Sequence, residues 1–233
     1  TADRYFSGKY DGGGFTVSGV FTPAGTGDDF SRQGLFGTAR SINSSNKVTI
    51  NNVKVVNSFI RGYQFVGSVI GVAGSNTTIT NCHSASSVTG VGYVGGVVGY
   101  SYDKAIITNC YYTGSVKGTG NTNFGGIVGE LEASTIENCG VEGAMISGSS
   151  NVGIFVGTTI NSLATVKNCY AIVDEALSPY GINSGTFTNC LWIAGGVKYR
   201  YGTDFSAFAW PNADSCPVPK SLSWIGQFWT GDI

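Results

Sequence analysis

A glycine-framed apolar unit that recurs at a nearly constant spacing is the feature that most constrains this chain. In each clear copy an apolar pair lies between glycines, and the unit closes on a glycine. The closing glycines recur at intervals of about 28 to 30 residues, and such a fixed period indicates a stack of similar structural units. Clear copies occupy residues 66–71, 94–99, 124–129 and 152–157, and degenerate copies occupy residues 34–37 and 180–185.

A second repeated unit, of the form apolar-x-Asn-Cys, lies between the glycine-framed copies. Its first copy ends on Val53 in place of the cysteine, and the step from Cys169 to Cys190 at the end is shorter than the others. The copies occupy residues 50–53, 79–82, 107–110, 136–139, 166–169 and 187–190. Each period therefore holds two or three segments of strand length separated by Gly, Asn and Ser turns, which leaves no room for a helix of ordinary length.

The length of the period distinguishes two repeat architectures. A propeller blade needs four antiparallel strands and typically about 40 residues or more. One coil of a solenoid needs fewer, and equivalent positions then stack about 4.8 Å apart in parallel sheets. We therefore predict an all-β fold, a parallel β-helix (single-stranded β-solenoid) of about six coils, which we expect to be right-handed. The shorter final step fits a shortened terminal coil.

The asparagine of the second unit predicts a corner. Ile79 and Cys82 are three residues apart, so strict alternation would place them on opposite faces of a strand. If Asn81 adopts a left-handed conformation, which asparagine tolerates better than most residues, both neighbours can face the core. We also expect the asparagine amides of successive coils to pair with one another.

Composition supports this fold and excludes two classes of partner. The chain has 36 glycines, only 12% charged residues and a formal net charge of -1. Without a run of Lys or Arg, the electrostatic signature of binding to nucleic acid or to an anionic membrane is missing. No stretch approaches the roughly 18 uninterrupted apolar residues of a membrane span, so we expect no span in this chain.

The repeats define the expected domain boundaries. We assign residues 1–195 to the solenoid, with residues 1–30 as an N-terminal entry coil, and residues 196–233 to a capping segment without repeats. The tail carries Trp210, Trp224 and Trp229, and the open hydrophobic end of a solenoid must be covered.

The glycine-framed units resemble the GLUG motif, a repeat named for its Gly-Leu-hydrophobic-Gly core. Residues 34–37 read Gly-Leu-Phe-Gly, and residues 6–20 are similar to the segment that precedes these repeats in many bacterial surface proteins. The resemblance covers residues 6–195, although Val, Ile or Phe replaces Leu in the central copies. It implies a secreted or cell-surface bacterial protein, either adhesin-like or the repeat region of an IgA-cleaving peptidase. Those peptidases are zinc enzymes with a His-Glu-x-x-His helix, and this chain has no such motif.

The cysteines are interpreted as buried free thiols. Five of the six occupy one repeat position, so neighbours would be separated by the rise of a coil, which is wider than the roughly 3.8 Å that a disulfide prefers between Cβ atoms. A small hydrophobe suits such a position. Cys216 has no repeat partner and could be free or bridged. Zinc is disfavoured because no CxxC pair exists. The five are Cys82, Cys110, Cys139, Cys169 and Cys190.

Residues for catalysis are few. His83 is the single histidine, it has no Asp or Ser partner at motif spacing, and we interpret it as an exposed strand residue. The densest charged group contains Asp103, Lys104, Glu130, Glu132 and Glu137. Because parallel β-helix enzymes build sites from carboxylates on one face, a carbohydrate-active lyase or hydrolase is the alternative function, although a solvated turn explains the group more simply.

Tyrosines near the strand ends are the candidate ligand-binding residues. Aromatic faces offer a large contact area to sugar or protein partners, although the rings could equally cover the edges of coils. We predict a non-catalytic adhesion or spacer module at the bacterial cell surface, without cofactor, metal or catalytic residue, that recognises a glycan or protein on a host or neighbouring cell. The candidates are Tyr63, Tyr93, Tyr100, Tyr102, Tyr111 and Tyr112.

Overall fold

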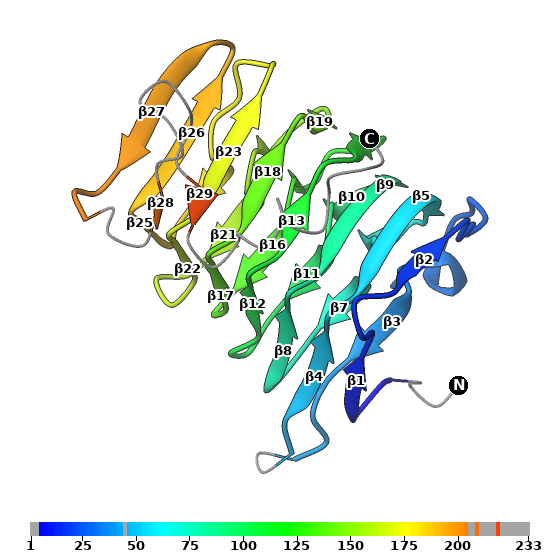
Figure 1. Cartoon of the computed structure of the whole chain (residues 1–233). Coiled ribbons are helices and arrows are strands. Elements are labelled where there is room, and N and C mark those ends of the chain that lie inside the picture. Colours follow the sequence, from blue (N-terminus) through cyan, green and yellow to red (C-terminus); the bar gives the residue numbers. More distant parts are fainter. Residues whose placement is uncertain (1–4, 44–45, 205–207, 210–217, 220–233) are drawn as a thin grey trace.

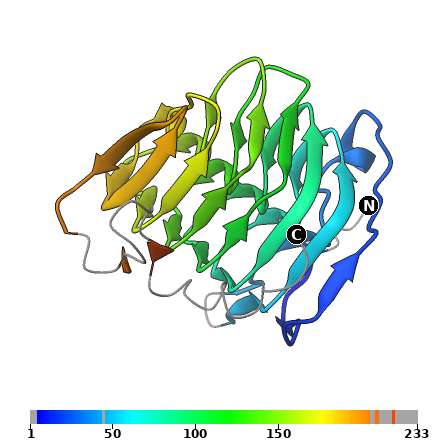
Figure 2. The same ribbon diagram turned by 45° about the horizontal axis from the view of Figure 1, so that its top comes forward.

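The computed structural model of the chain is an all-β parallel solenoid, as the repeats predicted (Figure 1). It describes residues 5–43, 46–204, 208–209 and 218–219. Successive turns lie beside one another, and four sheets, numbered 1 to 4 in chain order, run along the stack (Figure 2). Within the described residues, sheet 4 has six strands, one for each copy of the glycine-framed unit, and sheet 3 has four. Four turns therefore contribute to all four sheets.

Sheets 1 and 2 form the part of each turn that follows the glycine-framed unit. Sheet 1 contains β1 (Lys9–Asp11), β4 (Val48–Asn51), β8 (Thr77–Thr80), β12 (Ile106–Thr108), β17 (Thr135–Glu137), β22 (Thr165–Lys167) and β25 (Thr186–Thr188). Sheet 2 contains β2 (Thr16–Ser18), β5 (Lys54–Arg61), β9 (His83–Gly90), β13 (Tyr111–Tyr112), β14 (Ser115–Gly118), β18 (Gly140–Glu142), β19 (Met145–Ser147), β23 (Tyr170–Val173), β26 (Cys190–Ala194) and β27 (Val197–Tyr201).

Sheets 3 and 4 contain the glycine-framed unit itself. Sheet 3 consists of β6 (Gln64–Gly67), β10 (Gly92–Gly95), β15 (Phe124–Gly125) and β20 (Val152–Gly153). Sheet 4 consists of β3 (Phe36–Ala39), β7 (Ile70–Ala73), β11 (Val98–Ser101), β16 (Val128–Glu132), β21 (Val156–Ile160) and β24 (Tyr180–Asn183). A 3-10 turn, η1 (Asp28–Phe30), precedes β3, and β28 (Phe208–Ala209) pairs with β29 (Val218–Pro219).

The core is built from stacked equivalent positions of successive turns. In sheet 1, Ile50 pairs in register with Ile79, and the same column continues through the next turns. Its members from Ile50 to Val166 are fully buried, and Phe187 in the last turn is partly buried. This confirms the inward apolar column that the sequence predicted.

The asparagine corners are confirmed in their backbone conformation. All six asparagines have left-handed φ values between 51° and 55°. Around Asn81, the residue two positions before it, Ile79, and the residue directly after it, Cys82, are both fully buried. The amide ladder is less regular than expected. Asn81 Nδ2 donates to Asn52 Oδ1 at 3.3 Å, whereas the buried Oδ1 of Asn109 has no hydrogen-bond partner. Backbone conformation, rather than amide pairing, is therefore the shared property of these corners.

The five repeat cysteines are free and buried, as predicted. Each thiol donates to the backbone carbonyl two residues earlier, for example Cys110 Sγ to Thr108 O at 3.3 Å. Burial raises the pKa of the Cys110 thiol well above its usual value, which keeps this thiol in the protonated, unreactive form. Cys216 lies outside the described residues.

The two ends of the stack differ. At the N-terminal end, β1 and β2 add parallel strands to sheets 1 and 2. At the other end, β27 pairs antiparallel with β26, whereas the earlier strands of sheet 2 are parallel. Most of the cap expected over residues 196–233, with its three tryptophans, lies outside the described residues. In the part of the chain that the structure describes, no helix combines the length and apolar character needed to cross a bilayer.

Candidate binding face

Three of the six candidate tyrosines come together where sheets 3 and 4 meet. Tyr93 lies on β10, Tyr100 lies on β11, and Tyr102 follows β11 directly. Phe65, on β6 of the preceding turn, stacks on Tyr93 with ring centroids 4.8 Å apart, and its centroid lies 5.6 Å from that of Tyr100. Tyr100 also stacks on Tyr102 at 5.5 Å. We call these four half-buried rings the tyrosine face.

Close packing of two backbones creates the tyrosine face. Gly99 of β11 lies against β6, and a Cβ atom at this glycine would be only 2.5 Å from the Phe65 carbonyl carbon. Gly129 lies equally close to Tyr93 one turn later, at 2.6 Å. Because a strand of sheet 4 touches the sheet 3 strand of the preceding turn, side chains that point outward from both strands meet. In the four clear copies the closing glycine is thus required by this contact, and not by a positive φ.

Two aromatic residues of the tyrosine face have a costly backbone conformation. Phe65 and Tyr93 have φ values of 57° and 55°, a region that costs an ordinary residue about 1 kcal/mol or more and that asparagine or glycine enters more easily. Asn151 occupies the comparable place directly before β20, with a φ of 50°. Large rings at strained positions in two neighbouring turns suggest selection for the rings themselves.

Carboxylates and amides border the rings on the next two turns. Glu130 lies beside Tyr100 in the register of sheet 4 and accepts a hydrogen bond from Asn123 Nδ2. The Tyr100 hydroxyl donates to Glu132 Oε2. Asn123 Oδ1 in turn accepts from Thr158 Oγ1 at 2.7 Å and from Asn151 Nδ2 at 2.8 Å. These bonds hold the polar border in a fixed arrangement next to the tyrosine face.

Burial perturbs the titration of this border. Glu130 is only 8% exposed, and desolvation raises its pKa to about 7, against the opposing hydrogen bond from Asn123 and with a smaller contribution from the charge of Glu132. Burial and the bond to Glu132 also raise the pKa of Tyr100. The Tyr100 hydroxyl therefore stays protonated and serves as a donor.

The raised pKa of Glu130 predicts a pH-dependent effect on stability. In the unfolded chain the pKa of this carboxyl is near its ordinary value of 4.5. Its stabilising contribution is therefore complete below that pH and is lost as the pH rises to about 7. We expect Glu130→Gln to match the wild type in Tm at pH 4 and to exceed it by a few degrees at pH 8, by scanning calorimetry. An equal difference between the two proteins at both pH values would contradict this assignment.

The remaining candidate tyrosines lie elsewhere. Tyr112 points into the core, is fully buried and donates its hydroxyl to Ser86 O at 2.9 Å, so its prediction as a surface residue is wrong. Tyr111, its neighbour on β13, points to the opposite side of sheet 2, is 7% exposed and donates to Glu142. Tyr63 is half-buried before β6 and lies outside the ring contacts of the tyrosine face.

His83 is buried rather than exposed, which corrects the sequence-based interpretation. It is 4% exposed and stacks on Tyr111 with ring centroids 5.3 Å apart. Burial, with the charge of Lys54, lowers the His83 pKa to about 3. The imidazole is consequently neutral at physiological pH and is a poor general base.

The charged group that favoured an enzyme is divided by the fold. Glu137 lies on sheet 1 and forms an ion pair with Lys167 at 3.2 Å, while Asp103 and Lys104 are exposed beyond β11. Glu130 and Glu132 remain together on β16. Among the described residues, no three His, Cys, Asp or Glu side chains are grouped in a way that could hold a metal ion.

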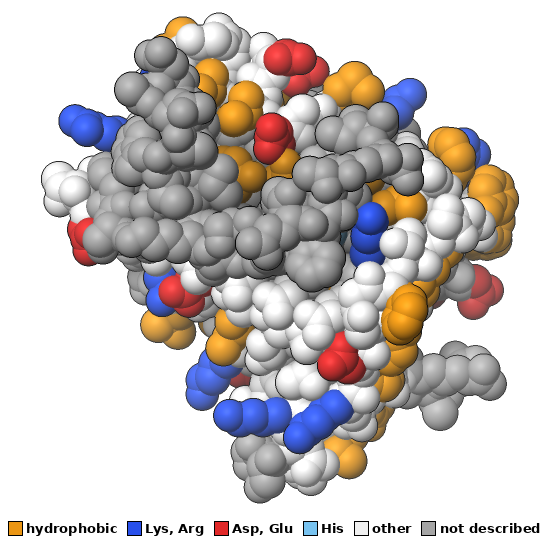
Figure 3. All heavy atoms as spheres, viewed as in Figure 1, with side chains coloured by type: hydrophobic (Ala, Val, Ile, Leu, Met, Phe, Trp, Pro, Cys, Tyr) orange, Lys and Arg blue, Asp and Glu red, His pale blue; other side chains and the backbone are white. Residues whose placement is uncertain are grey.

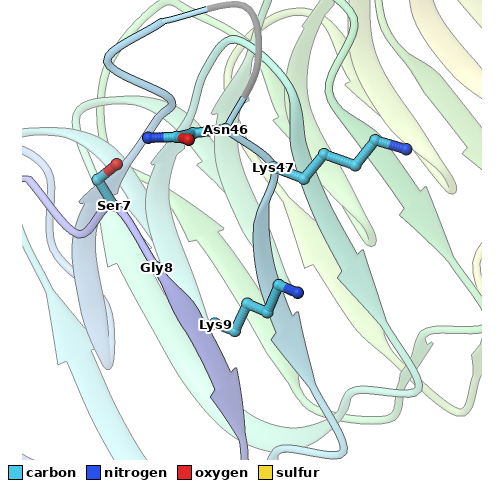
Figure 4. A pocket seen from close by; sticks show the side chains of 5 residues that line it. All are labelled: Ser7, Gly8, Lys9, Asn46 and Lys47. Carbon is cyan, nitrogen blue, oxygen red and sulfur yellow. The ribbon is translucent and has the colours of Figure 1, made fainter.

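A separate open pocket lies near the N-terminal strands. Figure 4 shows Lys9 projecting from β1 and Lys47 from the segment just before β4, with Ser7, Gly8 and Asn46 completing the lining of the pocket. On the face viewed in Figure 3, acidic and basic side chains otherwise lie scattered among uncharged ones. This pocket contains neither an aromatic ring nor a carboxylate, so the tyrosine face is the better candidate site.

Comparison with known proteins now identifies the repeats. The family model "The GLUG motif" matches residues 90–117 and 120–146. These two segments are GLUG repeats. The first GLUG repeat carries Tyr93, Tyr100 and Tyr102 of the tyrosine face, and the second carries Glu130 and Glu132, which border it. No curated protein gives a significant match to the sequence.

A solved structure shares the fold of this chain. It is a crystal structure of "a putative immunoglobulin A1 protease from Bacteroides ovatus", which superposes with a TM-score of 0.60 and 18% sequence identity over 91% of this chain and 76% of the other. At this identity the likeness concerns the fold alone. It agrees with the solenoid described above.

Sequence reasoning missed Phe65, Asn123 and Thr158 as parts of this region. A signal for Phe65 was present, because it precedes Val66 as Tyr93 precedes Val94, in register with the glycine-framed repeat. Asn123 and Thr158 gave no comparable signal, since the hydrogen bond between them joins residues 35 positions apart.

Proposed function

We propose that this chain is a non-catalytic binding module of a secreted bacterial protein, displayed at the cell surface, that recognises a glycan or a host protein through the tyrosine face. The observation that carries the proposal is the cluster of four half-buried rings, two of them at strained backbone positions. Rigid aromatic residues supply much of the energy at binding sites. The GLUG repeats and a Bacteroides solenoid of the same fold support the proposed location.

The rest of the fold suits a scaffold. The repeated glycine, asparagine and cysteine positions all serve backbone packing or the core. The residue types at these positions are therefore set by structural requirements. The tyrosine face departs from this regularity, because its residues change from turn to turn. A solenoid that varies its outer side chains over a constant core can present a specific surface at a distance from its attachment point.

Loss of the rings is expected to abolish most of the binding. Alanine at Tyr93 or Tyr100 should weaken binding to the best ligand of a glycan array, or to purified mucin, by about tenfold or more, because central aromatic residues often contribute about 2 kcal/mol or more. Tyr63→Ala is the matched control, since Tyr63 is a half-buried tyrosine outside the cluster. Equal losses in Tyr63→Ala and Tyr93→Ala, with unchanged circular dichroism, would refute the assignment.

One observation favours the alternative, a carbohydrate-active enzyme. Glu130 and Glu132 are two residues apart on β16, so their Cα atoms lie about 6 to 7 Å from each other, and the pKa of Glu130 is raised to about 7. Glycoside hydrolysis uses two carboxylates with different protonation states. Release of reducing ends from an array-positive polysaccharide, abolished by Glu130→Gln, would establish this alternative and overturn the non-catalytic proposal.

A further inference from the structure

We infer that the tyrosine face selects neutral, hydroxyl-rich glycans and rejects glycans that carry a carboxylate. This inference rests on the proposed function and specifies the class of ligand. It is carried by the two glutamates that border the rings, Glu130 and Glu132, and by the position of the nearby cations. The order of these groups along the stack gives the face one acidic end.

The rings provide the apolar part of a sugar site. Tyr93 is stacked by Phe65 from the preceding turn, while the following turn places Asn123 at the comparable position of sheet 3, with no aromatic ring there. One side of the tyrosine cluster is therefore bordered by amide and carboxylate groups. A hexose combines a C–H surface that packs on aromatic rings with hydroxyls that need acceptors. The rings supply the first kind of contact, and the polar border beside them supplies the second.

Glu132 is the residue best placed to accept those hydroxyls. It is half-buried and accepts one hydrogen bond, from Tyr100, so its carboxylate retains capacity for further donors. Bonds from hydroxyls to a charged acceptor are stronger than bonds between neutral groups. Glu130 lies deeper, 8% exposed and beside Tyr100 in the register of the sheet. Because burial raises its pKa to about 7, Glu130 is partly protonated at neutral pH, and Glu132 supplies most of the negative charge at the site.

The same charges oppose an acidic ligand. A carboxylate brought beside Glu132 would meet a like charge in a partly desolvated place, which is an effective means of rejecting a wrong ligand. Arg32 is a cation of this region, with its guanidinium 6.0 Å from the Phe65 ring centroid. It lies three turns below the turn of Glu130, about 14 Å at the usual strand spacing, so salt screens its effect at the glutamates.

Neighbouring charges do not reverse this balance. Asp103 and Lys104 follow Tyr102 in the sequence, are both exposed, and have opposite charges. On the glutamate side, the polar neighbours of Glu130 are the uncharged Asn123 and, through it, Thr158 and Asn151. The border of the site facing the rings is therefore net negative.

A matched pair of ligands tests the inference. Titration calorimetry would compare a neutral tetrasaccharide of galactose, glucose and N-acetylglucosamine with the same glycan capped by one sialic acid. We expect the wild type to bind the neutral glycan at least tenfold more tightly. Glu132→Gln, which keeps an oxygen acceptor for Tyr100 but removes the charge, should bring the two affinities within about threefold. Glu175→Gln is the control, because Glu175 is exposed in the loop after β23 and changes the net charge equally.

The possible outcomes separate the inference from the proposed function. Equal or tighter binding of the sialylated glycan, lost in Tyr93→Ala, would overturn the inference and leave the binding function in place. A preference for the neutral glycan that Glu132→Gln and Glu175→Gln reduce equally would also overturn it, because the effect would then come from net charge alone. If neither glycan binds and mucin binding is unaffected by Tyr93→Ala, the inference and the assignment of the face both fail.

Discussion

Replacing Gly129 by alanine is expected to cost about 3 kcal/mol or more of the free energy of unfolding, since overpacking costs about 1 to 3 kcal/mol even where side chains can move. A Cβ atom at Gly129 would lie 2.6 Å from Gly99 O, from the Tyr93 carbonyl carbon and from the Val94 nitrogen. These are backbone atoms of the preceding turn, held by the sheets, so no side-chain rotation can relieve the contact. Urea unfolding followed by circular dichroism measures the loss.

Gly8→Ala is the matched control for this substitution. A Cβ atom there would meet the edge of the Phe6 ring at 3.5 Å, which is an ordinary van der Waals contact, and Gly8 lies just before β1. We expect a change within about 0.5 kcal/mol, as for surface substitutions in general. If Gly129→Ala unfolded at the same urea concentration as Gly8→Ala, the close contact between sheets 3 and 4 would be contradicted.

Asn109→Ala is expected to have the second largest effect, a loss of about 1 to 2 kcal/mol, which is the cost of a left-handed conformation in an ordinary residue. Asn109 has a φ of 53° at the corner between β12 and β13. Its backbone N–H donates to Glu137 O of the next turn at 3.1 Å, so the corner cannot change conformation without disturbing the stack.

Two further variants separate the backbone from the side chain at this corner. Asn109→Gly also removes the amide but tolerates the left-handed conformation, so it should be clearly more stable than Asn109→Ala. Thr108→Ala changes a half-exposed outward residue on β12 and should cost within about 0.5 kcal/mol. Equal losses in Asn109→Ala and Asn109→Gly would show that the amide, and not the backbone, stabilises the corner.

The candidate site was only partly accessible to sequence reasoning. Tyr93, Tyr100 and Tyr102 were identified as candidates, and the structure brings them together. Tyr111 and Tyr112 were both proposed as surface residues, although adjacent residues of a strand point to opposite faces, and Tyr112 is in the core. The alternation of side chains along a strand could therefore have predicted that Tyr111 and Tyr112 do not share one face. The contact of Tyr93 with Phe65, which belongs to the preceding turn of the stack, became visible only in the structure.

The sequence by itself determined the period, the parallel stack, the inward Ile and Cys columns and the asparagine corners, because each of these follows from a local property repeated in every turn. Only the tertiary structure decided which outer faces meet. The glycine-framed unit folds sheet 4 against the sheet 3 strand of the preceding turn, and this close backbone contact brings Phe65 and Tyr93 to Tyr100, and Asn123 to Glu130. Such contacts depend on the angle between two sheets, which hydrophobic periodicity does not encode.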